Sequence, residues 1–315
     1  MTAHPHNTNN AINNLLYTII SFNTSSFNKF WRSMLPPQRL LTAALMILSS
    51  LAMSAQAATV SVSNYPLFLL SEAVTQGSPS ANRLLQSGEI GHHASVSPGD
   101  IKAISDSTFV VWFGPLLENN LSSTLESAPN AISLLGFDAF DRLPLRDVKG
   151  QPIKGTLDPH IYLDPDNAKA ITRALAVIHS HANPQYKALY QANAQKFAER
   201  MDKAVAAQNI KQKNRPYWAY HDAYQYIEKS MQLQFAGSLT FDEEVAPTAS
   251  QLRWLDEQRP TKQMCLITES ALAKGLLAKL KPVNTTVQVE DMSNSKDFVS
   301  GWQAIARGVK SCIEG

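Results

Sequence analysis

From Thr59 to the end of the chain, short runs of β-branched and aromatic residues alternate with longer segments in which apolar residues recur every three or four positions. The short runs predict strands, and the longer segments predict amphipathic helices. The expected strands lie at residues 59–62, 109–112, 132–135, 217–220, 232–236, 264–268 and 286–289. Strand and helix patterns in alternation are typical of an α/β fold with a largely parallel sheet.

The middle of the chain lacks a strand pattern and favours helices. One helix is expected to begin at Pro165, and a second, opened by Asn183-Pro184, continues for about 27 residues without an internal Gly or Pro. At 1.5 Å per residue, a helix of that length spans about 40 Å. We therefore expect two similar α/β lobes with parallel-rich sheets, joined by a long rigid helix. The expected boundaries are residues 58–182, 183–212 and 213–315.

The first 57 residues are typical of a secretory leader. Their only charged side chains are three basic ones, an apolar run follows at residues 40–52, and Ala55-Gln56-Ala57 supplies a small-x-small site. This order predicts a signal peptide that is cleaved after Ala57. The alternative is a membrane anchor, but a run of about 13 residues is shorter than the ~20 that span a bilayer. Met34 is an alternative start of translation.

Removing this leader changes the charge balance of the chain. The full sequence has 28 basic and 26 acidic residues and a formal charge of +2, whereas residues 58–315 keep 25 basic and 26 acidic residues, a formal charge of −1. We find no basic stripe with interleaved aromatic residues, so no nucleic-acid partner is expected. The common hydrolase, P-loop, dinucleotide-binding and HExxH motifs are also absent from the sequence.

Two cysteines, Cys265 and Cys312, remain after removal of the leader. An even number of cysteines in an exported chain favours one disulfide, which would connect the C-terminal helix to a core strand. Two reduced, buried thiols are the alternative, and a zinc site made from two lone cysteines is a weaker one.

Three histidines share a local setting that favours ligand binding. His92, His160 and His221 each lie at the end of an apolar run or in a loop just before a helix. In open α/β sheets, ligands bind at the carboxyl ends of strands and in the loops that lead into helices. Two of these histidines would come from the first lobe and one from the second, so they can converge only in a cleft between lobes. Read singly, each could instead cap a helix.

Imidazole is a good zinc ligand, and a tetrahedral site needs a fourth donor. Asp291, which follows the last expected strand, is the first choice, and Glu290 and Glu269 are less favoured rivals. His179 and His181 form a separate case, because they lie at the end of a helix, where imidazolium interacts favourably with the helix dipole.

At these histidines the chain resembles the periplasmic zinc receptors of bacterial ABC importers, the ZnuA-like group within the cluster of zinc and manganese receptors. The resemblance covers essentially all of residues 58–315. Its motifs stand at residues 92–100 (HHASVSPGD), 110–118 (VVWFGPLLE), 158–165 (DPHIYLDP) and 220–226 (YHDAYQY). Because manganese receptors of this cluster tend to carry Glu at the third ligand, His221 favours zinc.

The resemblance implies a receptor and not an enzyme. It implies a monomer that captures Zn²⁺ in the periplasm, holds it in the interlobe cleft and delivers it to an ABC transporter permease. The implied metal ligands are His92, His160, His221 and Asp291. It also implies a disulfide between Cys265 and Cys312, which is similar to that of Gram-negative zinc receptors.

The sequence departs from the family pattern at two places. Many zinc receptors carry a long loop rich in His and Asp before the second ligand, whereas residues 137–157 contain no His. Gly91 replaces the usual Pro before the first ligand, His92, and a second histidine, His93, follows that ligand. Two other functions stay open: a manganese or iron receptor of the same fold, and a secreted zinc hydrolase in which Glu269 would be the general base.

Overall fold

The computed structural model describes residues 59–86, 96–210, 214–242 and 245–314, and the leader and His92 lie outside these ranges. The described residues belong to one compact unit, which begins at Thr59. Within these ranges we find no helix with the combination of length and apolar character that crossing a membrane requires. The predicted signal peptide and its cleavage site stay predictions, because residues 1–58 lie outside the described ranges.

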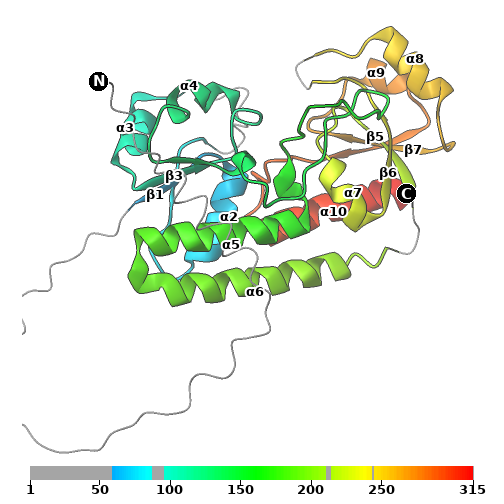
Figure 1. Ribbon diagram of the computed structural model, residues 1–315. Coiled ribbons are helices and arrows are strands. Elements are labelled where there is room, and N and C mark those ends of the chain that lie inside the picture. Colours follow the sequence, from blue (N-terminus) through cyan, green and yellow to red (C-terminus); the bar gives the residue numbers. More distant parts are fainter. Residues whose placement is uncertain (1–58, 87–95, 211–213, 243–244, 315) are drawn as a thin grey trace, which may run out of the picture. The chain divides into compact units, whose positions relative to one another are not determined.

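Two four-stranded sheets, each entirely parallel, organise this unit (Figure 1). The first contains β1 (Val60–Val62), β2 (Asn82–Arg83), β3 (Phe109–Trp112) and β4 (Ala131–Ser133), in the order β2-β1-β3-β4. The second contains β5 (Arg215–Ala219), β6 (Leu233–Ser238), β7 (Met264–Thr268) and β8 (Val283–Val287), in the order β6-β5-β7-β8. The two matching sheets confirm the expected two-lobe α/β architecture.

Several of the described helices begin at a short polar residue whose side chain caps them. The described helices are α2 (Tyr65–Thr75), α3 (Pro98–Asp106), α4 (Ser122–Leu125), α5 (Pro165–Ala182), α6 (Lys187–Ala206), α7 (Glu228–Met231), α8 (Ala249–Glu257), α9 (Lys274–Ala278) and α10 (Phe298–Glu314). The Asn64 side chain caps α2, a Ser97–Asp100 capping box opens α3, and Asp164 caps α5. Each of these caps satisfies backbone N–H groups that the helix itself leaves unpaired.

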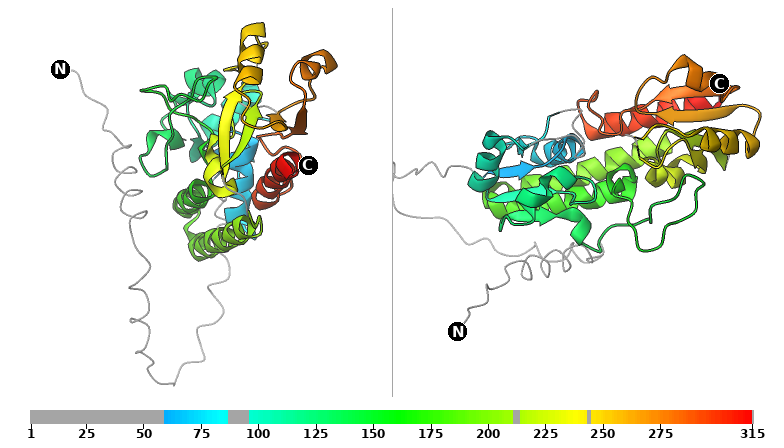
Figure 2. Two further views of the ribbon diagram at one scale, coloured as in Figure 1. Left: turned by 90° about the vertical axis from the view of Figure 1, so that its right-hand side faces the viewer. Right: turned by 90° about the horizontal axis from the view of Figure 1, so that it is seen from above.

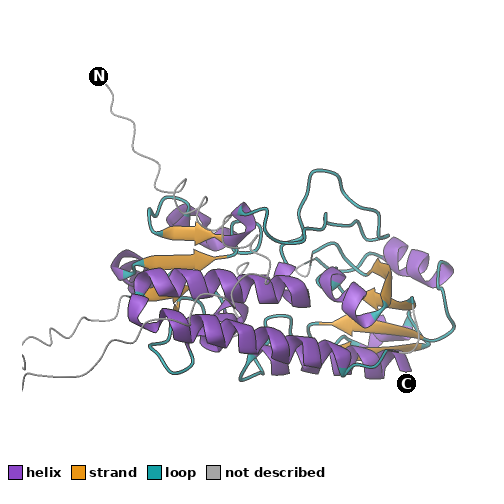
Figure 3. Ribbon diagram, turned by 60° about the horizontal axis from the view of Figure 1, so that its bottom comes forward, coloured by secondary structure: helices purple, strands orange, loops and turns teal. Residues whose placement is uncertain are grey.

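The connection between the sheets is a packed helical layer and not a single strut. Helix α6 has 20 residues, about 30 Å, because Pro184–Tyr186 forms a 3₁₀ turn and the helix ends at Ala206. It is shorter than the expected helix, and it lies beside α5 (Figure 3). Helix α10 extends from the second sheet toward α2 (Figures 1 and 2), and the Phe197 and Phe298 rings of α6 and α10 meet at 5.9 Å.

One hydrophobic core is continuous through this helical layer. It joins residues of the first sheet such as Val62 and Val111 to residues of the second such as Tyr217 and Ile267. Smaller clusters cover the opposite face of each sheet, against α3 and α4 in one case and α8 and α9 in the other. Because close-packed interiors transmit displacement, the shared core limits how far the two sheets can move apart.

His179 differs from its sequence-based interpretation. It is buried, its Nε2 lies 2.8 Å from Ser71 Oγ, and its ring packs against Tyr190. Burial lowers the pKa of His179 to about 4, so the side chain is neutral near pH 7 and is part of the core. The expected interaction of a charged imidazole with the helix dipole is therefore wrong for His179, and for the exposed His181 it stays a prediction.

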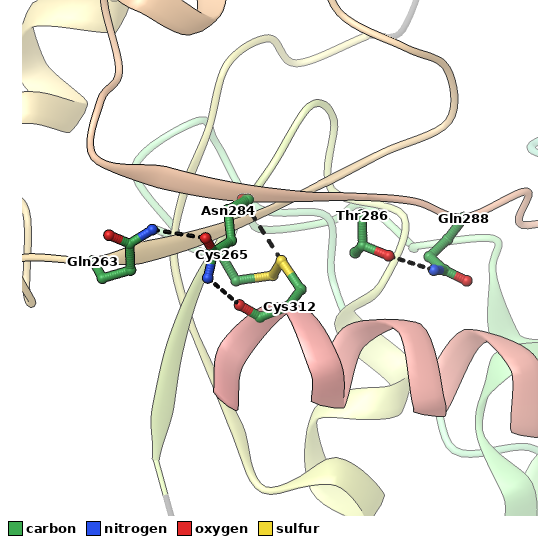
Figure 4. The surroundings of a disulfide bond; sticks show 6 residues. All are labelled: Gln263, Cys265, Asn284, Thr286, Gln288 and Cys312. Atoms are coloured by element: carbon green, nitrogen blue, oxygen red, sulfur yellow. Dashed lines mark hydrogen bonds between the residues drawn. A yellow bond between two sulfur atoms is a disulfide. The ribbon is translucent and has the colours of Figure 1, made fainter. Parts of the chain in front are cut away.

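The predicted disulfide is present and closes the second sheet against the last helix. Cys265 of β7 bonds to Cys312 of α10, with the two Cα atoms 5.4 Å apart (Figure 4). Beside it, Asn284 Nδ2 donates to the Cys312 carbonyl at 3.0 Å and Gln263 Nε2 donates to Asn284 Oδ1 at 2.8 Å. The bond thus lies beside hydrogen bonds that connect β8 to α10 and to the residue that precedes β7.

The motif at residues 110–118 builds a tight turn at the carboxyl end of β3. Gly114 has a φ of +130°, and a Cβ there would lie 2.6 Å from Ser133 Oγ. The turn brings the fully buried Glu118 back to the strand. There its two oxygens accept hydrogen bonds from Asn64 Nδ2 and from the backbone N–H groups of Phe113 and Gly114. Burial raises the pKa of Glu118 to about 7, although these hydrogen bonds act in the opposite direction and lower it.

We expect Glu118→Gln to lower the free energy of unfolding by about 1–3 kcal/mol, because either orientation of the amide sets its NH₂ group against an N–H donor. Urea denaturation followed by circular dichroism measures this change. Glu126→Gln, at an exposed position, is the matched control. A Glu118→Gln protein as stable as the native one would contradict the view that the hydrogen bonds accepted by the Glu118 carboxyl group stabilise this turn.

Candidate metal centre

Three buried side chains from distant parts of the sequence converge at the carboxyl ends of the second sheet's strands. His221 follows β5 by two residues, and Glu290 follows β8 by three. His160 immediately precedes a 3₁₀ turn, Ile161–Leu163, that leads into α5. Strand β7 lies between β5 and β8, so the two residues of the second sheet reach the site from either side of a central strand. This is the sheet edge at which α/β proteins bind ligands.

The geometry of this group suits a small cation. His160 Nε2 lies 3.6 Å and His221 Nε2 lies 3.7 Å from Glu290 Oε2. One ligand atom from each of the three residues can be chosen so that all lie within 4.8 Å of one another. Zinc bonds of about 2.0–2.2 Å in a tetrahedron place ligand atoms roughly 3.3–3.6 Å apart. A small contraction would therefore bring the three donors to bonding distance of one ion.

Carboxylates contact the opposite ring nitrogen of both histidines. Asp158 Oδ1 lies 2.7 Å from His160 Nδ1, and Asp158 Oδ2 accepts a hydrogen bond from Gln225 Nε2 at 2.9 Å. Glu269 Oε1 lies 3.4 Å from His221 Nδ1, which is long for a hydrogen bond. Contacts of this kind fix the tautomer and orientation of a metal-binding imidazole and leave Nε2 for the metal.

The electrostatics of the site favour positive charge. Burial disfavours imidazolium, but the carboxylates of Glu290 and Asp158 outweigh it and raise the pKa of His160 well above its ordinary value. Burial likewise opposes ionisation of His221, whereas Glu269 and Glu290 raise its pKa to about 9. Without a metal, the site therefore holds protons at the nitrogen atoms that a cation would need.

Two of the four predicted ligands are found in this group. His92 lies outside the described residues. Asp291 is buried, and its Oδ1 accepts a hydrogen bond from the Ser293 backbone N–H at 2.9 Å. The neighbouring Glu290, which ranked lower on the sequence, takes its place beside the two histidines. The geometry therefore favours Glu290 as the acidic ligand, and Asp291 stays a prediction from the sequence.

Two supporting residues were not singled out by the sequence analysis. Asp158 stands two positions before His160 and is fully buried, and Gln225 stands four positions after His221. Their closeness in sequence to predicted ligands is a usable signal, since metal-binding histidines commonly contact a carboxylate through the second ring nitrogen. Nothing in the spacing indicates that Gln225 connects the two sides of the site.

Comparison with known proteins gives one family and many similar structures. Residues 60–300 match the family model described as the periplasmic zinc-uptake complex component A, ZnuA. The high-affinity zinc uptake system protein ZnuA of Brucella abortus is 26% identical over 264 residues, which cover 70% of this chain and 78% of that protein.

Among solved structures, a crystal structure of ZnuA superposes with a TM-score of 0.66 at 17% identity, over 82% of this chain and 99% of that one. Zn(II)-bound AdcA from Streptococcus pneumoniae superposes with a TM-score of 0.64 at 19% identity, over 82% of this chain. This chain spans 58% of the AdcA chain. At these identities, the superpositions establish the shared fold.

Proposed function

This chain belongs to the family of periplasmic zinc-uptake complex components A, and from that membership we propose that it captures Zn²⁺ in the periplasm and delivers it to the permease of an ABC importer. The observation that supports this function best is the buried group of His160, His221 and Glu290. Two imidazoles and a carboxylate at these distances form a donor set that zinc prefers, and the histidine at position 221 favours zinc over manganese.

We propose that the zinc ligands are His92, His160, His221 and Glu290. His92 completes the set in this proposal because its sequence setting matches those of the other two histidines. Together, Zn²⁺ and its ligands, three neutral imidazoles and one carboxylate, would carry one net positive charge. The protein would bind zinc and hand it over, without chemistry on the metal.

The function is tested by titrating the exported protein with Zn²⁺ at pH 7.5 in a calorimeter, with Mn²⁺ and Fe²⁺ as competitors. We expect tight binding of one zinc ion, which excess Mn²⁺ or Fe²⁺ does not displace. His221→Ala should abolish tight binding, whereas His181→Ala, at an exposed histidine outside the site, should bind as the native protein does. Absence of zinc binding by the native protein would refute the function.

The hydrolase alternative loses support from the position of Glu269. This residue contacts Nδ1 of His221, whereas Nε2 of the same ring faces Glu290. Glu269 therefore lies on the side of the ring away from the proposed metal position, where it orients His221. A general base would have to lie within hydrogen-bond reach of a metal-bound water.

Zinc binding is expected to release protons at pH 8, because the pKa of about 9 keeps His221 protonated in the metal-free protein. As the pH falls below 9, protons compete more strongly for Nε2, so the apparent association constant should fall by about tenfold per pH unit for each displaced proton. Calorimetry in two buffers with different ionisation enthalpies counts the protons. Binding that releases none at pH 8 would contradict the protonated state of the free site.

We further propose that the mature protein is a periplasmic monomer that begins at Ala58. Export from a cell that carries the full-length gene, followed by mass spectrometry of the intact periplasmic protein, should give the mass of residues 58–315. A mass that includes the residues before Ala58 would show that the leader is retained.

A further inference from the structure

The segment 143–157, which we call the strap, leads from the first sheet toward His160 and lies against the second sheet (Figure 1). The Ser238 N–H of β6 donates to the Val148 carbonyl at 3.0 Å. Gln225 Nε2 donates to the Pro144 carbonyl at 3.0 Å, and the Leu143 N–H donates to the Tyr226 hydroxyl at 2.9 Å. The strap therefore ties chain from the first half of the sequence to the edge of the second sheet.

Arg146 is the charged anchor of this strap. Its Nε and Nη2 donate to the two carboxylate oxygens of Asp222, each at 2.7 Å, and Nη2 also lies 2.7 Å from Glu228 Oε1. The guanidinium stacks on the Phe235 ring at 4.1 Å. The side chains of Arg146 and Asp222 are only 12% and 10% exposed, so this two-pronged pair is shielded from water. Planar, paired geometry of this kind is specific to Arg.

The anchor acts on the residue next to a proposed zinc ligand. Asp222 directly follows His221, whose Nδ1 has its nearest carboxylate at 3.4 Å, against 2.7 Å for His160. The side-chain contact on His221 is thus the looser of the two. The backbone of the turn must therefore contribute more to the position of the His221 ring than it does for His160.

Without the guanidinium, two carboxylates would face each other in this shielded place. Asp222 and Glu228 both contact Arg146, and like charges that are removed from water repel strongly. Their separation would displace the turn that carries Asp222 and with it His221. Arg146 therefore offsets one of the two negative charges and also holds the turn in place.

We propose that Arg146 is a positioning residue for zinc binding, which holds His221 in place through Asp222 and so makes the strap part of the metal site. This inference rests on the proposed function. It assigns to the strap the role of keeping zinc from leaving, because a turn that shifts would let one imidazole leave the ion.

The test compares Arg146→Lys and Arg146→Met with the native protein, each loaded with Zn²⁺. Release of zinc to an excess of a chromophoric chelator is followed by stopped flow, and X-ray absorption at the zinc edge counts the imidazoles. The loss of a supporting contact around a metal ligand typically lowers metal affinity by about 10–100-fold. We therefore expect Arg146→Lys to release zinc about tenfold faster than the native protein. Arg146→Met should release it faster still and show one imidazole fewer. If Arg146→Met fails to fold, the lysine variant carries the test.

Arg259→Lys is the matched control. Arg259 is also 12% exposed on its side chain, stacks on the Trp218 ring at 4.7 Å and pairs with Asp256 at 2.9 Å. Its other hydrogen bonds go to the backbone carbonyls of Lys262, Leu280 and Pro282, outside the strap and the proposed ligands. This variant should lower the melting temperature and leave the release rate unchanged.

The possible outcomes separate the inference from the function on which it rests. Faster release from both Arg146 variants, with a native rate in Arg259→Lys, supports the positioning role. A lowered melting temperature with a native release rate and native coordination in Arg146→Lys means that Arg146 is merely structural, and it overturns the inference alone. Failure of the native protein to hold zinc overturns the proposed function and the inference with it.

Discussion

Glu290→Gln is expected to weaken zinc binding by more than about 100-fold. The loss of a residue that only supports a metal ligand already lowers metal affinity by about 10–100-fold, and the loss of a ligand itself lowers it further. The substitution keeps the shape of the side chain but removes the negative charge that faces both His160 Nε2 and His221 Nε2. A neutral amide oxygen is a poorer zinc ligand than a carboxylate. Competition with a chromophoric chelator of known affinity measures the change.

Asp291→Asn is the matched control, because it makes the same chemical change one residue away. Asp291 Oδ1 accepts a hydrogen bond from the Ser293 N–H, which an amide oxygen can also accept. We therefore expect its zinc affinity to stay within about tenfold of the native value, below the loss of a metal ligand. If Asp291→Asn loses zinc and Glu290→Gln keeps it, the sequence-based choice of Asp291 is right and the geometric assignment of Glu290 is wrong.

The choice between these adjacent acids depends on a turn that the sequence does not reveal. After β8 the chain turns sharply, with the Met292 N–H donating to the Val289 carbonyl and a φ of +56° at Met292. Successive side chains in such a turn point in different directions. Spacing could place an acid at the end of the strand, but the direction of each carboxylate depends on backbone angles that a non-glycine residue seldom adopts.

His160 and His221 could be predicted because their signals are local. Each stands beside a strand end or a helix start, and the fold class makes such positions converge. The alternation of strand and helix patterns likewise predicted the parallel sheets. By contrast, Arg146 joins Asp222 across 76 positions of sequence, and no local pattern around a lone Arg identifies its distant partner.

The helices were predicted less well where local preferences compete with tertiary contacts. The residue pattern after His221 predicts a helix from Ala223, but Gln225–Ile227 is a 3₁₀ turn followed by the short α7. Here Gln225 and Tyr226 use their side chains to bind Asp158 and the strap, which fixes the backbone of this segment. The side-chain contacts of the candidate metal centre thus override the helical pattern, as is common at functional sites.

Replacing both cysteines, as Cys265→Ala with Cys312→Ala, is expected to lower the free energy of unfolding by about 4 kcal/mol in the chain-entropy model for a loop of this length. The cysteines are separated by 47 positions, so the bond restricts a long segment of the unfolded chain that includes β8 and most of α10. Both side chains are buried, and alanine fits their sites without adding a polar group.

The same double variant is expected to keep its zinc affinity within about twofold, a change far smaller than that for the loss of a supporting contact. Cys265 is the second residue of β7, whereas Glu269 follows the carboxyl end of that strand beside the site. The bond therefore stabilises the end of the sheet away from the metal. Urea denaturation with and without a reductant provides the control, because a reductant should destabilise the native protein and leave the double variant unchanged. Equal unfolding free energies for the native protein and the double variant, both measured without reductant, would show that the disulfide does not stabilise this fold.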